Sequence, residues 1–213
     1  MWPSMMCADF ANLAAEVTAL EEAKVSGFHI DFMDGVFVPN FGMGLQDFET
    51  IRNLTTLPVD VHLMIKNPTE YIEKFANLGA DIIYFHPEID IHPARTIDKI
   101  KQFGKKAGIA INPGTSIETI KELLAIIDNV MVMTVNPGFA GQKYLEYTTD
   151  KIKQINRYKE KNDYQYQIFV DGAISPNKIT ELSALGVEGF ILGTSALFGK
   201  EESYTNLIKK LKD

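Results

Sequence analysis

Cysteine and long hydrophobic runs are what this chain has least of. Cys7 is its single cysteine, so no disulfide can form within the chain, which fits a reducing compartment. No apolar stretch reaches the roughly 18 residues that a membrane-spanning helix needs. The N-terminus also lacks the basic segment followed by an apolar stretch that is typical of a secretory signal. We therefore expect a cytoplasmic protein that does not insert into a membrane.

Positive charge is also in short supply. The chain has 21 lysines and arginines against 28 aspartates and glutamates, which gives a net charge of −7 at pH 7. Basic and acidic residues are interspersed, as in residues 159–161, and no basic stripe predicts nucleic-acid binding. Because this net charge does not attract an anion, a phosphate-bearing substrate would need a local site, for example one built from backbone N–H groups.

The chain does show a regular alternation of short apolar runs and amphipathic stretches. Its 213 residues suit a single domain over 1–213, because no linker, charge block or low-complexity segment divides them. The apolar runs are nearly continuous, as expected for parallel strands buried on both faces. We predict strands over residues 1–5, 27–33, 59–64, 82–86, 108–111, 129–134, 167–170 and 189–192.

Helices are predicted between these strands. Apolar residues recur with helical spacing over residues 10–24, 69–78, 94–106, 117–127, 149–161, 175–185 and 204–211. Asp9 is suited to cap the first of these helices. Proline stands near three helix starts, where it is tolerated, and glycine follows three helix ends, as expected of C-caps: Pro68, Pro93 and Pro176, then Gly79, Gly108 and Gly186.

Eight strand–helix units indicate either a closed (β/α)8 barrel or a doubly wound sheet. The first strand is not followed by Gly-x-Gly-x-x-Gly, which disfavours a dinucleotide-binding sheet. Polar residues at the C-terminal ends of the strands favour the barrel, because a barrel brings these ends to one face, where active sites lie. They are Ser4, His29, Asp31, His62, His86, Asn112, Asn136, Asp171 and Gly193.

Two histidines and two aspartates among these residues form a candidate metal site. His29 and Asp31 are two residues apart on one strand, so their side chains point to the same side. His62 and Asp171 end two later strands. Two imidazoles and two carboxylates suit Zn²⁺, Mn²⁺, Fe²⁺ or Co²⁺. Any one of the four alone could equally be a hydrogen-bonded core residue, but their shared position at strand ends favours the metal site.

Other residues near the strand ends leave alternatives open. His86 and Glu88 either support the metal ligands from behind or belong to an ordinary loop. Asp34 and Gly35 are typical of a turn, and His92 is placed at a helix entry. Three methionines either fill gaps in the core or form an apolar lining against a planar intermediate: Met33, Met64 and Met133.

Two glycine-rich segments follow the sixth and eighth predicted strands, at residues 136–142 and 192–196. Phosphate sites in barrels are frequently built from the late loops and a short helix N-terminus. Gly172, Gly193, Thr194 and Ser195 fit such a site through their backbone N–H and hydroxyl groups.

Residues 29–40, His-Ile-Asp-Phe-Met-Asp-Gly-Val-Phe-Val-Pro-Asn, resemble the H-x-D-x-M-D-G-x-F-V-P-N signature of ribulose-phosphate 3-epimerases. Residues 60–64, 133–142 and 170–172 match the D-x-H-L-M, M-x-V-N-P-G-F-x-G-Q and V-D-G motifs of this family, in the same order. The resemblance runs from residue 4 to residue 198. These motifs are long and specific, which makes a chance match a poor explanation.

The resemblance implies a (β/α)8 barrel that epimerises a ketose phosphate at C3. It implies one divalent ion, usually zinc, with manganese, iron, cobalt or magnesium as alternatives. The ligands would be His29, Asp31, His62 and Asp171, and Asp31 and Asp171 would also be the two bases. Substrate would contact Ser4, His62 and the methionines, lie under Gly138, Phe139, Ala140 and Gly141, and place its phosphate near Gly172, Ala173, Gly193, Thr194 and Ser195. Such barrels commonly form homo-oligomers, which we expect here.

A few loop residues indicate which sugar phosphate would be the substrate. Met6-Cys7 replaces the Leu-Ser usual in pentulose enzymes, and Ala140 replaces a glycine. Together with residues 157–173 and 193–198, these features resemble the D-allulose-6-phosphate 3-epimerase branch. Asn136 and residues 112–115 are closer to the pentulose pattern. We therefore expect conversion of D-allulose 6-phosphate to D-fructose 6-phosphate, with D-ribulose 5-phosphate to D-xylulose 5-phosphate as the alternative.

Two other functions are less well supported. Phosphosugar decarboxylases and aldol-type synthases on similar barrels resemble D-x-K-x-x-D after an early strand, but residues 31–34 contain no lysine. A non-catalytic sugar-phosphate binding barrel would be expected to have lost a ligand or a base, and all of them are present here.

Overall fold

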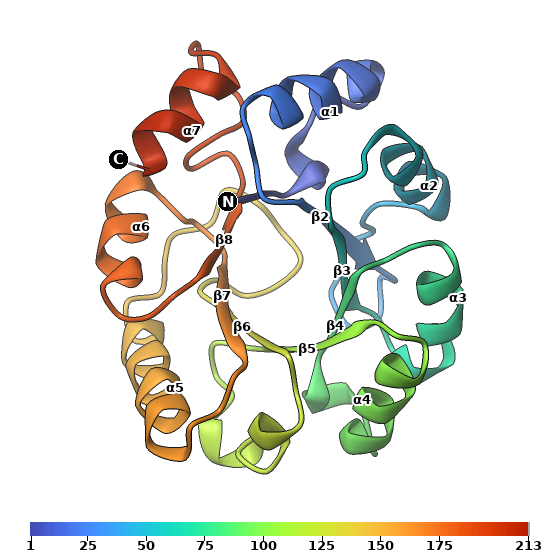
Figure 1. Cartoon of the computed structure of the whole chain (residues 1–213), viewed down its shortest axis with the longest axis vertical. Helices are drawn as coiled ribbons and strands as arrows, with labels where there is room; N and C mark the ends of the chain where they lie inside the picture. Colours follow the sequence, from blue (N-terminus) through green and yellow to red (C-terminus); the bar gives the residue numbers. More distant parts are fainter. Residues whose placement is uncertain (213) are drawn as a thin grey trace.

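A ring of eight parallel strands forms the centre of the molecule (Figure 1). The computed structural model describes residues 1–212. The strand order is β1-β8-β7-β6-β5-β4-β3-β2, and a backbone bridge between Ser4 and His29 joins the two ends. The predicted barrel is therefore confirmed over the doubly wound sheet. The strands are β1 Trp2–Pro3, β2 Phe28–Met33, β3 Val59–Met64, β4 Ile82–Phe85, β5 Lys106–Ile111, β6 Asn129–Met133, β7 Gln167–Asp171 and β8 Gly189–Leu192.

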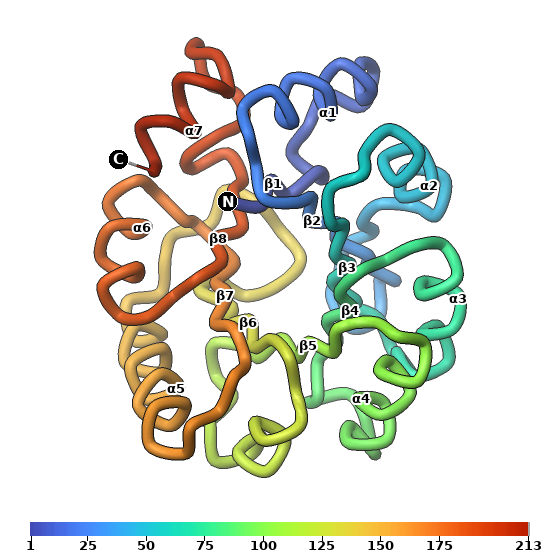
Figure 2. The backbone as a smooth tube through the Cα atoms, viewed as in Figure 1, coloured from blue at the N-terminus to red at the C-terminus, as the bar shows by residue number. Residues whose placement is uncertain are grey.

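Helices surround this ring on the outside, and the chain passes once around it from blue to red (Figure 2). This single circuit brings the first and last strands together, and β1 pairs with β8. The α-helices of the described residues are α1 Leu13–Glu22, α2 Leu45–Leu54, α3 Ile72–Asn77, α4 Pro93–Gln102, α5 Thr148–Asn162, α6 Pro176–Ser183 and α7 Tyr204–Lys212.

The strands are buried on both faces, which explains their nearly continuous apolar sequences. Their outward side chains pack against the helices: the rings of Phe32 on β2 and Phe75 on α3 lie edge to face with centroids 4.5 Å apart. Their inward side chains fill the barrel, where the rings of Trp2 and Phe169 lie 5.6 Å apart. Side chains therefore fill the interior of the barrel, and a substrate site is expected at the C-terminal ends of the strands.

Two helical segments differ from the prediction. Helix α2 was not predicted, and its N-cap, Gly44, has no side chain that could indicate a helix start. Residues 117–127, predicted as a helix, form two short 3₁₀ turns at Ile117–Thr119 and Leu123–Ala125. The buried residues of this segment have a spacing that also suits a helix, so their pattern alone does not distinguish the two structures: Ile117, Ile120, Leu123, Leu124 and Ile127.

The helix and strand ends are mostly where they were predicted. Asp9 caps a 3₁₀ turn at Phe10–Asn12 that leads into α1, and Gly79 and Gly186 follow α3 and α6 with φ of +100° and +88°. The prediction for Gly108 was wrong, because it lies inside β5. A Cβ there would lie 2.3 Å from the Tyr84 ring, so Gly108 makes room for that side chain. The predicted first strand, residues 1–5, is shortened to β1.

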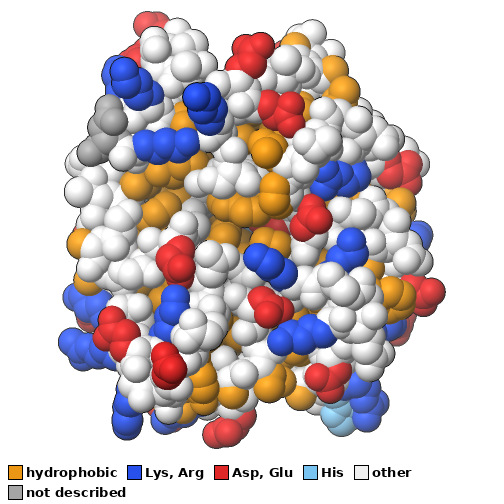
Figure 3. All heavy atoms as spheres, viewed as in Figure 1, with side chains coloured by type: hydrophobic (Ala, Val, Ile, Leu, Met, Phe, Trp, Pro, Cys, Tyr) orange, Lys and Arg blue, Asp and Glu red, His pale blue; other side chains and the backbone are white. Residues whose placement is uncertain are grey.

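Charged side chains of both signs are interspersed over the side of the molecule drawn in Figure 3. Within residues 1–212, no helix combines the length and the apolar character that crossing a membrane requires.

Candidate active site

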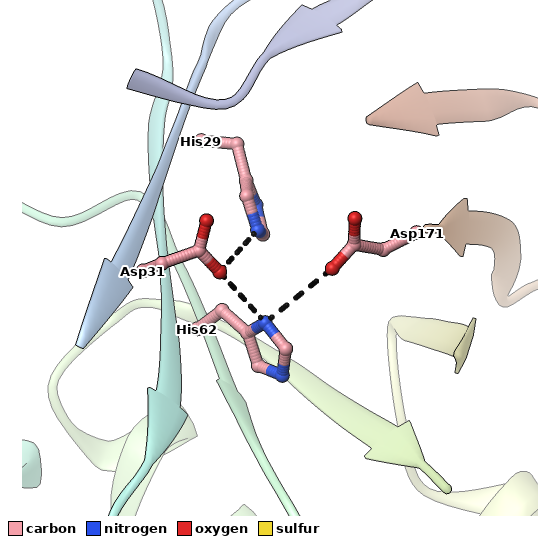
Figure 4. A group of neighbouring side chains, drawn as sticks. All are labelled: His29, Asp31, His62 and Asp171. Carbon is pink, nitrogen blue, oxygen red and sulfur yellow. Dashed lines mark hydrogen bonds and ion pairs between the residues drawn. The ribbon is translucent and has the colours of Figure 1, made fainter. Parts of the chain in front are cut away.

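Four side chains from three strands meet at the C-terminal end of the barrel (Figure 4). His29 and Asp31 come from β2, His62 from β3 and Asp171 from the last position of β7. The register pairs Asp31 with His62 on the neighbouring strand. Asp171 faces Asp31 from the other side of the group, and His62 lies between the two carboxylates (Figure 4). The barrel thus gathers residues that are 142 positions apart into one cluster (171 − 29).

The spacing of the donor atoms suits one metal ion. One ligand atom from each of the four residues lies within 4.8 Å of the other three. His29 Nε2 and His62 Nδ1 are each 3.2 Å from Asp31 Oδ1, and His62 Nδ1 is 3.8 Å from Asp171 Oδ2. A tetrahedral ion with bonds of about 2.1 Å needs ligand atoms about 3.4 Å apart. The cluster can therefore hold a divalent ion through two nitrogens and two oxygens.

The two carboxylates have opposite pKa shifts in the metal-free protein. Burial raises the pKa of Asp31, but the imidazoles of His29 and His62 outweigh it and hold this pKa well below its usual range. Burial, and then the charge of Asp31, raises the pKa of Asp171 to about 6. Two carboxyl groups whose pKa values are pushed apart are suited to serve as an ionised base and a protonated acid.

Asp60 supports the cluster from behind and was not singled out in the sequence. Its Oδ1 is 2.5 Å from His29 Nδ1, and both side chains are fully buried. Although burial lowers the pKa of His29, the carboxylates of Asp60 and then Asp31 raise it well above its usual value. Asp60 stands two positions before His62 on β3, so its side chain points to the same face. That spacing is a signal that could have found it.

All of the residues predicted to bind substrate line one pocket over the cluster except His62, which is fully buried. Asp31 and Asp171 open into it, whereas His29 and His62 lie beneath its surface. The predicted residues in its wall are Ser4, Met33, Met64, Met133, Gly138, Phe139, Ala140, Gly141, Gly172, Ala173, Gly193, Thr194 and Ser195. Further lining residues, not predicted, are Met6, Cys7, Val135, Pro137, Gln142 and Ile191. Ser4 Oγ donates a hydrogen bond of 2.8 Å to Asp31 Oδ2.

The three methionines are buried and also line the pocket. Met33, Met64 and Met133 are at most 8% exposed, so they belong to the core. They also form part of the pocket wall. Apolar sulfur-containing side chains therefore face the carboxylates across the space that a substrate would occupy.

The loop after β6 is held over the pocket by specific contacts. Asn40 Nδ2, from the loop after β2, donates a 2.7 Å hydrogen bond to the carbonyl of Gly138. Gln142 Nε2 donates to the carbonyls of Asn136 and Phe139 at 2.6 and 2.9 Å. Gly138 has φ of +114°, a conformation that disfavours other residues. These contacts join two loops above the cluster.

The loops near the proposed phosphate site have unusual backbone conformations. Gly172 and Ala173 follow β7 with φ of +118° and +54°. A positive φ is uncommon for alanine, and such residues cluster at functional sites.

Two residues near other strand ends have the structural roles predicted for them. Asp34 Oδ1 accepts hydrogen bonds from Val36 N and Phe37 N, which confirms the predicted turn. His92 directly precedes α4, as predicted.

Comparison with known protein families decides which barrel this is. A model of the ribulose-phosphate 3 epimerase family matches residues 1–198. The chain belongs to this family. It is therefore an isomerase of the epimerase type, and the resemblance found in the sequence motifs is confirmed. Its substrates belong to the class of small sugar phosphates.

Three relatives show how this epimerase compares with named enzymes. It is 37% identical over 211 residues to ribulose-phosphate 3-epimerase of Aquifex aeolicus, covering 98% of this chain and 95% of the relative. It is 41% identical over 201 residues to the enzyme of the same name from Bacillus subtilis, covering 94% and 92%. It is 39% identical over 212 residues to the chloroplastic ribulose-5-phosphate-3-epimerase of Arabidopsis thaliana, covering 99% and 75%. These names support the pentulose alternative rather than the expected preference for D-allulose 6-phosphate.

Solved structures of other proteins share the fold of the epimerase. A 3-keto-L-gulonate-6-phosphate decarboxylase from Vibrio cholerae aligns with a TM-score of 0.72 at 16% identity, covering 100% of this chain and 94% of the other. A mutant tryptophan synthase alpha-subunit from Pyrococcus furiosus aligns with a TM-score of 0.70 at 14% identity, covering 99% and 94%. Likeness at such low identity concerns the barrel alone.

Proposed function

We propose that this epimerase interconverts D-ribulose 5-phosphate and D-xylulose 5-phosphate by inverting C3. The names of its relatives support the pentulose substrate. One structural observation carries the reaction type: Asp31 and Asp171 approach one pocket from different walls, with His62 Nδ1 3.2 and 3.8 Å from their nearest oxygens. Inversion needs such a pair, because a proton must leave one face of the sugar carbon and return to the other.

In one direction Asp31 takes the C3 proton and Asp171 supplies a proton to the opposite face. In the reverse direction the roles exchange. The Ser4 hydroxyl, which donates to Asp31 Oδ2, fixes the orientation of that carboxylate toward the substrate. The apolar walls made by Met33, Met64 and Met133 exclude water, which favours proton transfer between carboxylate and carbon.

We propose zinc as the ion of the four-residue cluster. Two imidazole nitrogens favour zinc, manganese, iron or cobalt over magnesium, which prefers oxygen ligands. The charges of Asp31 and Asp171 balance a divalent cation in this buried place. When bound, the ion would act as a Lewis acid toward the ketose oxygens and offset the negative charge that develops on proton removal.

The phosphate group of the substrate is proposed to lie at the loops after β7 and β8. Gly172, Ala173, Gly193, Thr194 and Ser195 offer backbone N–H and hydroxyl donors along one wall of the pocket. The net charge of −7 requires that attraction for the phosphate be local, as these donors are. The loop from Gly138 to Gly141 would cover the bound sugar. A cytoplasmic location and a homo-oligomeric state remain predictions.

A direct comparison of substrates tests the proposed sugar. The kcat/KM for D-ribulose 5-phosphate should exceed that for D-allulose 6-phosphate by about tenfold or more, because a pocket fitted to one sugar loses binding energy with a mismatched one. Both substrates are assayed with the same zinc-loaded preparation. A higher kcat/KM for allulose 6-phosphate would overturn the pentulose proposal while leaving the epimerase reaction in place.

Hydrogen exchange with solvent tests the reaction itself. In D₂O the enzyme should introduce deuterium at C3 of ribulose 5-phosphate, because the proton passes through carboxylates that exchange with water. Deuterium at C1 would instead indicate aldose–ketose isomerisation. A protein that binds the sugar phosphate without exchanging any carbon-bound proton would be a binding barrel and not an enzyme.

A further inference from the structure

His86 is a fully buried histidine that the proposed reaction does not use. It directly follows β4. Its Nε2 lies 2.9 Å from Nε2 of His62, and the two rings are within 30° of each other with centroids 5.1 Å apart. The Phe37 ring packs against it with centroids 4.7 Å apart. His86 is therefore enclosed between the Phe37 ring and His62, one of the four proposed metal ligands.

The contact between the two histidines constrains their protons. At 2.9 Å, one Nε2 must donate and the other accept, because two lone pairs or two N–H groups would repel. His62 turns its Nδ1 toward the carboxylates, and a nitrogen that binds a cation must present a lone pair. The proton of His62 is then on Nε2, and His86 accepts it at its own Nε2.

With its Nε2 accepting, neutral His86 has its own proton on Nδ1. Among the described residues this nitrogen forms no hydrogen bond, and its neighbour is Glu88 Oε2, a carboxylate oxygen 3.4 Å away that can only accept. Glu88 is fixed on its other side, because its Oε1 accepts hydrogen bonds from Asn112 N at 2.8 Å and Thr115 Oγ1 at 2.6 Å. Donation thus runs from His62 through His86 toward Glu88, and the loop after β5 donates to the same carboxylate from the other side.

Lys151 fixes the far end of this chain. Its Nζ, on α5, donates hydrogen bonds of 2.7 Å to the carbonyls of Asn112 and Pro113, the residues that follow β5. The backbone that holds Glu88 is therefore itself attached to a helix. An anchored acceptor restricts rotation of the His86 ring, and through it of His62.

We propose that His86, held by Glu88, is a positioning residue that fixes the tautomer and the ring orientation of His62. It does for His62 what Asp60 does for His29, but with a neutral acceptor in place of a carboxylate. The inference rests on the proposed metal site. Hydrogen-bonded partners of this kind fix the ligand nitrogen that is offered to an ion and tune its affinity.

Zinc affinity measures this effect independently of turnover. Competition with a chromophoric chelator should show His86→Leu weakening zinc binding about 10- to 100-fold, the range typical of lost partners behind a ligand. His86→Gln should lose less, because its amide oxygen still accepts from His62 Nε2. His92→Gln is the matched control: His92 is exposed and lies outside the cluster, so its affinity should equal that of the wild type. Equal affinity in His86→Leu and wild type would overturn the proposal.

A double-mutant cycle separates positioning from a general effect on folding. In a His62→Ala background, His86→Leu should change zinc affinity by less than about twofold, because the residue through which it acts is gone. The same loss in both backgrounds would contradict action through His62. The melting temperature of each metal-free variant is recorded alongside.

The tautomers can be read without any substitution. The chain has four histidines, so a long-range ¹H–¹⁵N spectrum of the zinc-loaded protein is simple to assign. His62 should carry its proton on Nε2 and His86 on Nδ1. A proton on Nε2 of His86 would overturn the proposal even if a variant failed to fold. Wild-type protein that binds no zinc would instead contradict the metal-dependent function on which the inference rests.

Discussion

At the scale of single residues, the proposed reaction places two demands on Asp31 and Asp171. As carboxylates they would balance the charge of a cation, and as bases they would move a proton between solvent and carbon. Their surroundings differ accordingly: Asp31 is in contact with both histidines, whereas the side chain of Asp171 keeps 18% of its surface exposed toward the pocket. A substitution at either position should therefore affect both metal binding and proton transfer.

Asp31→Asn and Asp171→Asn should each lower kcat by about 100- to 10,000-fold, the usual contribution of a positioned acid or base. The amide keeps the shape of the side chain but neither takes up a proton nor balances the ion. Turnover of ribulose 5-phosphate and zinc content are measured on the same samples. Asp98→Asn, a change at an exposed carboxylate on α4, is the control. Near-normal turnover in either site variant would refute the two-base assignment.

Residues of the site were predictable where position alone implies a shared face. Asp171 ends β7, whereas His29, Asp31 and His62 lie within β2 and β3 and not at their predicted strand ends. The barrel still brings all four together, because inward-facing residues of its strands share one interior. His86 and Glu88 remained undecided because their role depends on which way a ring turns, and hydrogen bonds formed in the folded protein determine that. The substrate-contacting roles of the lining residues remain predictions, although their place in one pocket is clear.

At the scale of elements, the loops after β2 and β6 act together. Asn40 donates to the Gly138 carbonyl, and a Cβ on Gly138 would lie 3.0 Å from Val38 Cβ. The two loops are thus fitted to each other as well as hydrogen-bonded. We expect this contact to hold the loop from Gly138 to Gly141 in place over a bound sugar.

Asn40→Ala should raise KM for ribulose 5-phosphate about fivefold, which corresponds to the loss of one hydrogen bond of about 1 kcal/mol. The melting temperature should change little, because the contact lies between surface loops. Asn162→Ala is a matched control: it removes a 2.8 Å side-chain hydrogen bond to the Tyr158 carbonyl at the end of α5. Steady-state kinetics of both variants decide the point, and an unchanged KM in Asn40→Ala would show that the contact has no part in substrate binding.

Elements were predictable where burial is continuous, and less so where a pattern fits more than one structure. The strands β3 and β8 begin and end at the predicted residues, and every residue in them is buried. Helix α2 was not predicted, and its N-cap, Gly44, has no side chain that could indicate a helix start. The buried residues of the segment after β5 have a spacing that suits a helix, yet the segment forms 3₁₀ turns. Gly108 was predicted as a C-cap, but a glycine is needed there to make room for the Tyr84 ring on the neighbouring strand.

At the scale of the whole molecule, the barrel was predictable because each strand–helix unit is encoded locally. Closure of the barrel is not local. It depends on the backbone bridge between Ser4, which directly follows the two-residue strand β1, and His29 on β2. The loops alone do not decide the sugar: a few substitutions favour allulose 6-phosphate, whereas the names of the relatives favour the pentulose. A single loop residue would contact only part of a substrate, so each carries little information about the whole.

At the scale of the whole molecule, bound zinc should reverse the way in which stability depends on pH. In the metal-free protein, burial followed by the charge of Asp31 raises the pKa of Asp171 from 3.8 to about 6. The folded state then binds more protons than the unfolded state between these values, so the contribution of Asp171 to stability falls as pH rises from about 4 to about 6. In the zinc-loaded protein the contribution of Asp171 to stability should instead increase as pH rises, because the ligands of zinc must be deprotonated.

The difference in melting temperature between wild type and Asp171→Asn isolates this contribution, since the amide does not titrate. For metal-free proteins, wild type minus variant should become more negative as pH rises from about 4 to about 6. For zinc-loaded proteins it should become more positive over the same range. The other carboxylates and histidines are common to both proteins, so their titration largely cancels. A difference that does not vary with pH would mean that Asp171 titrates normally, whereas one that varies without regard to zinc would remove Asp171 from the metal cluster.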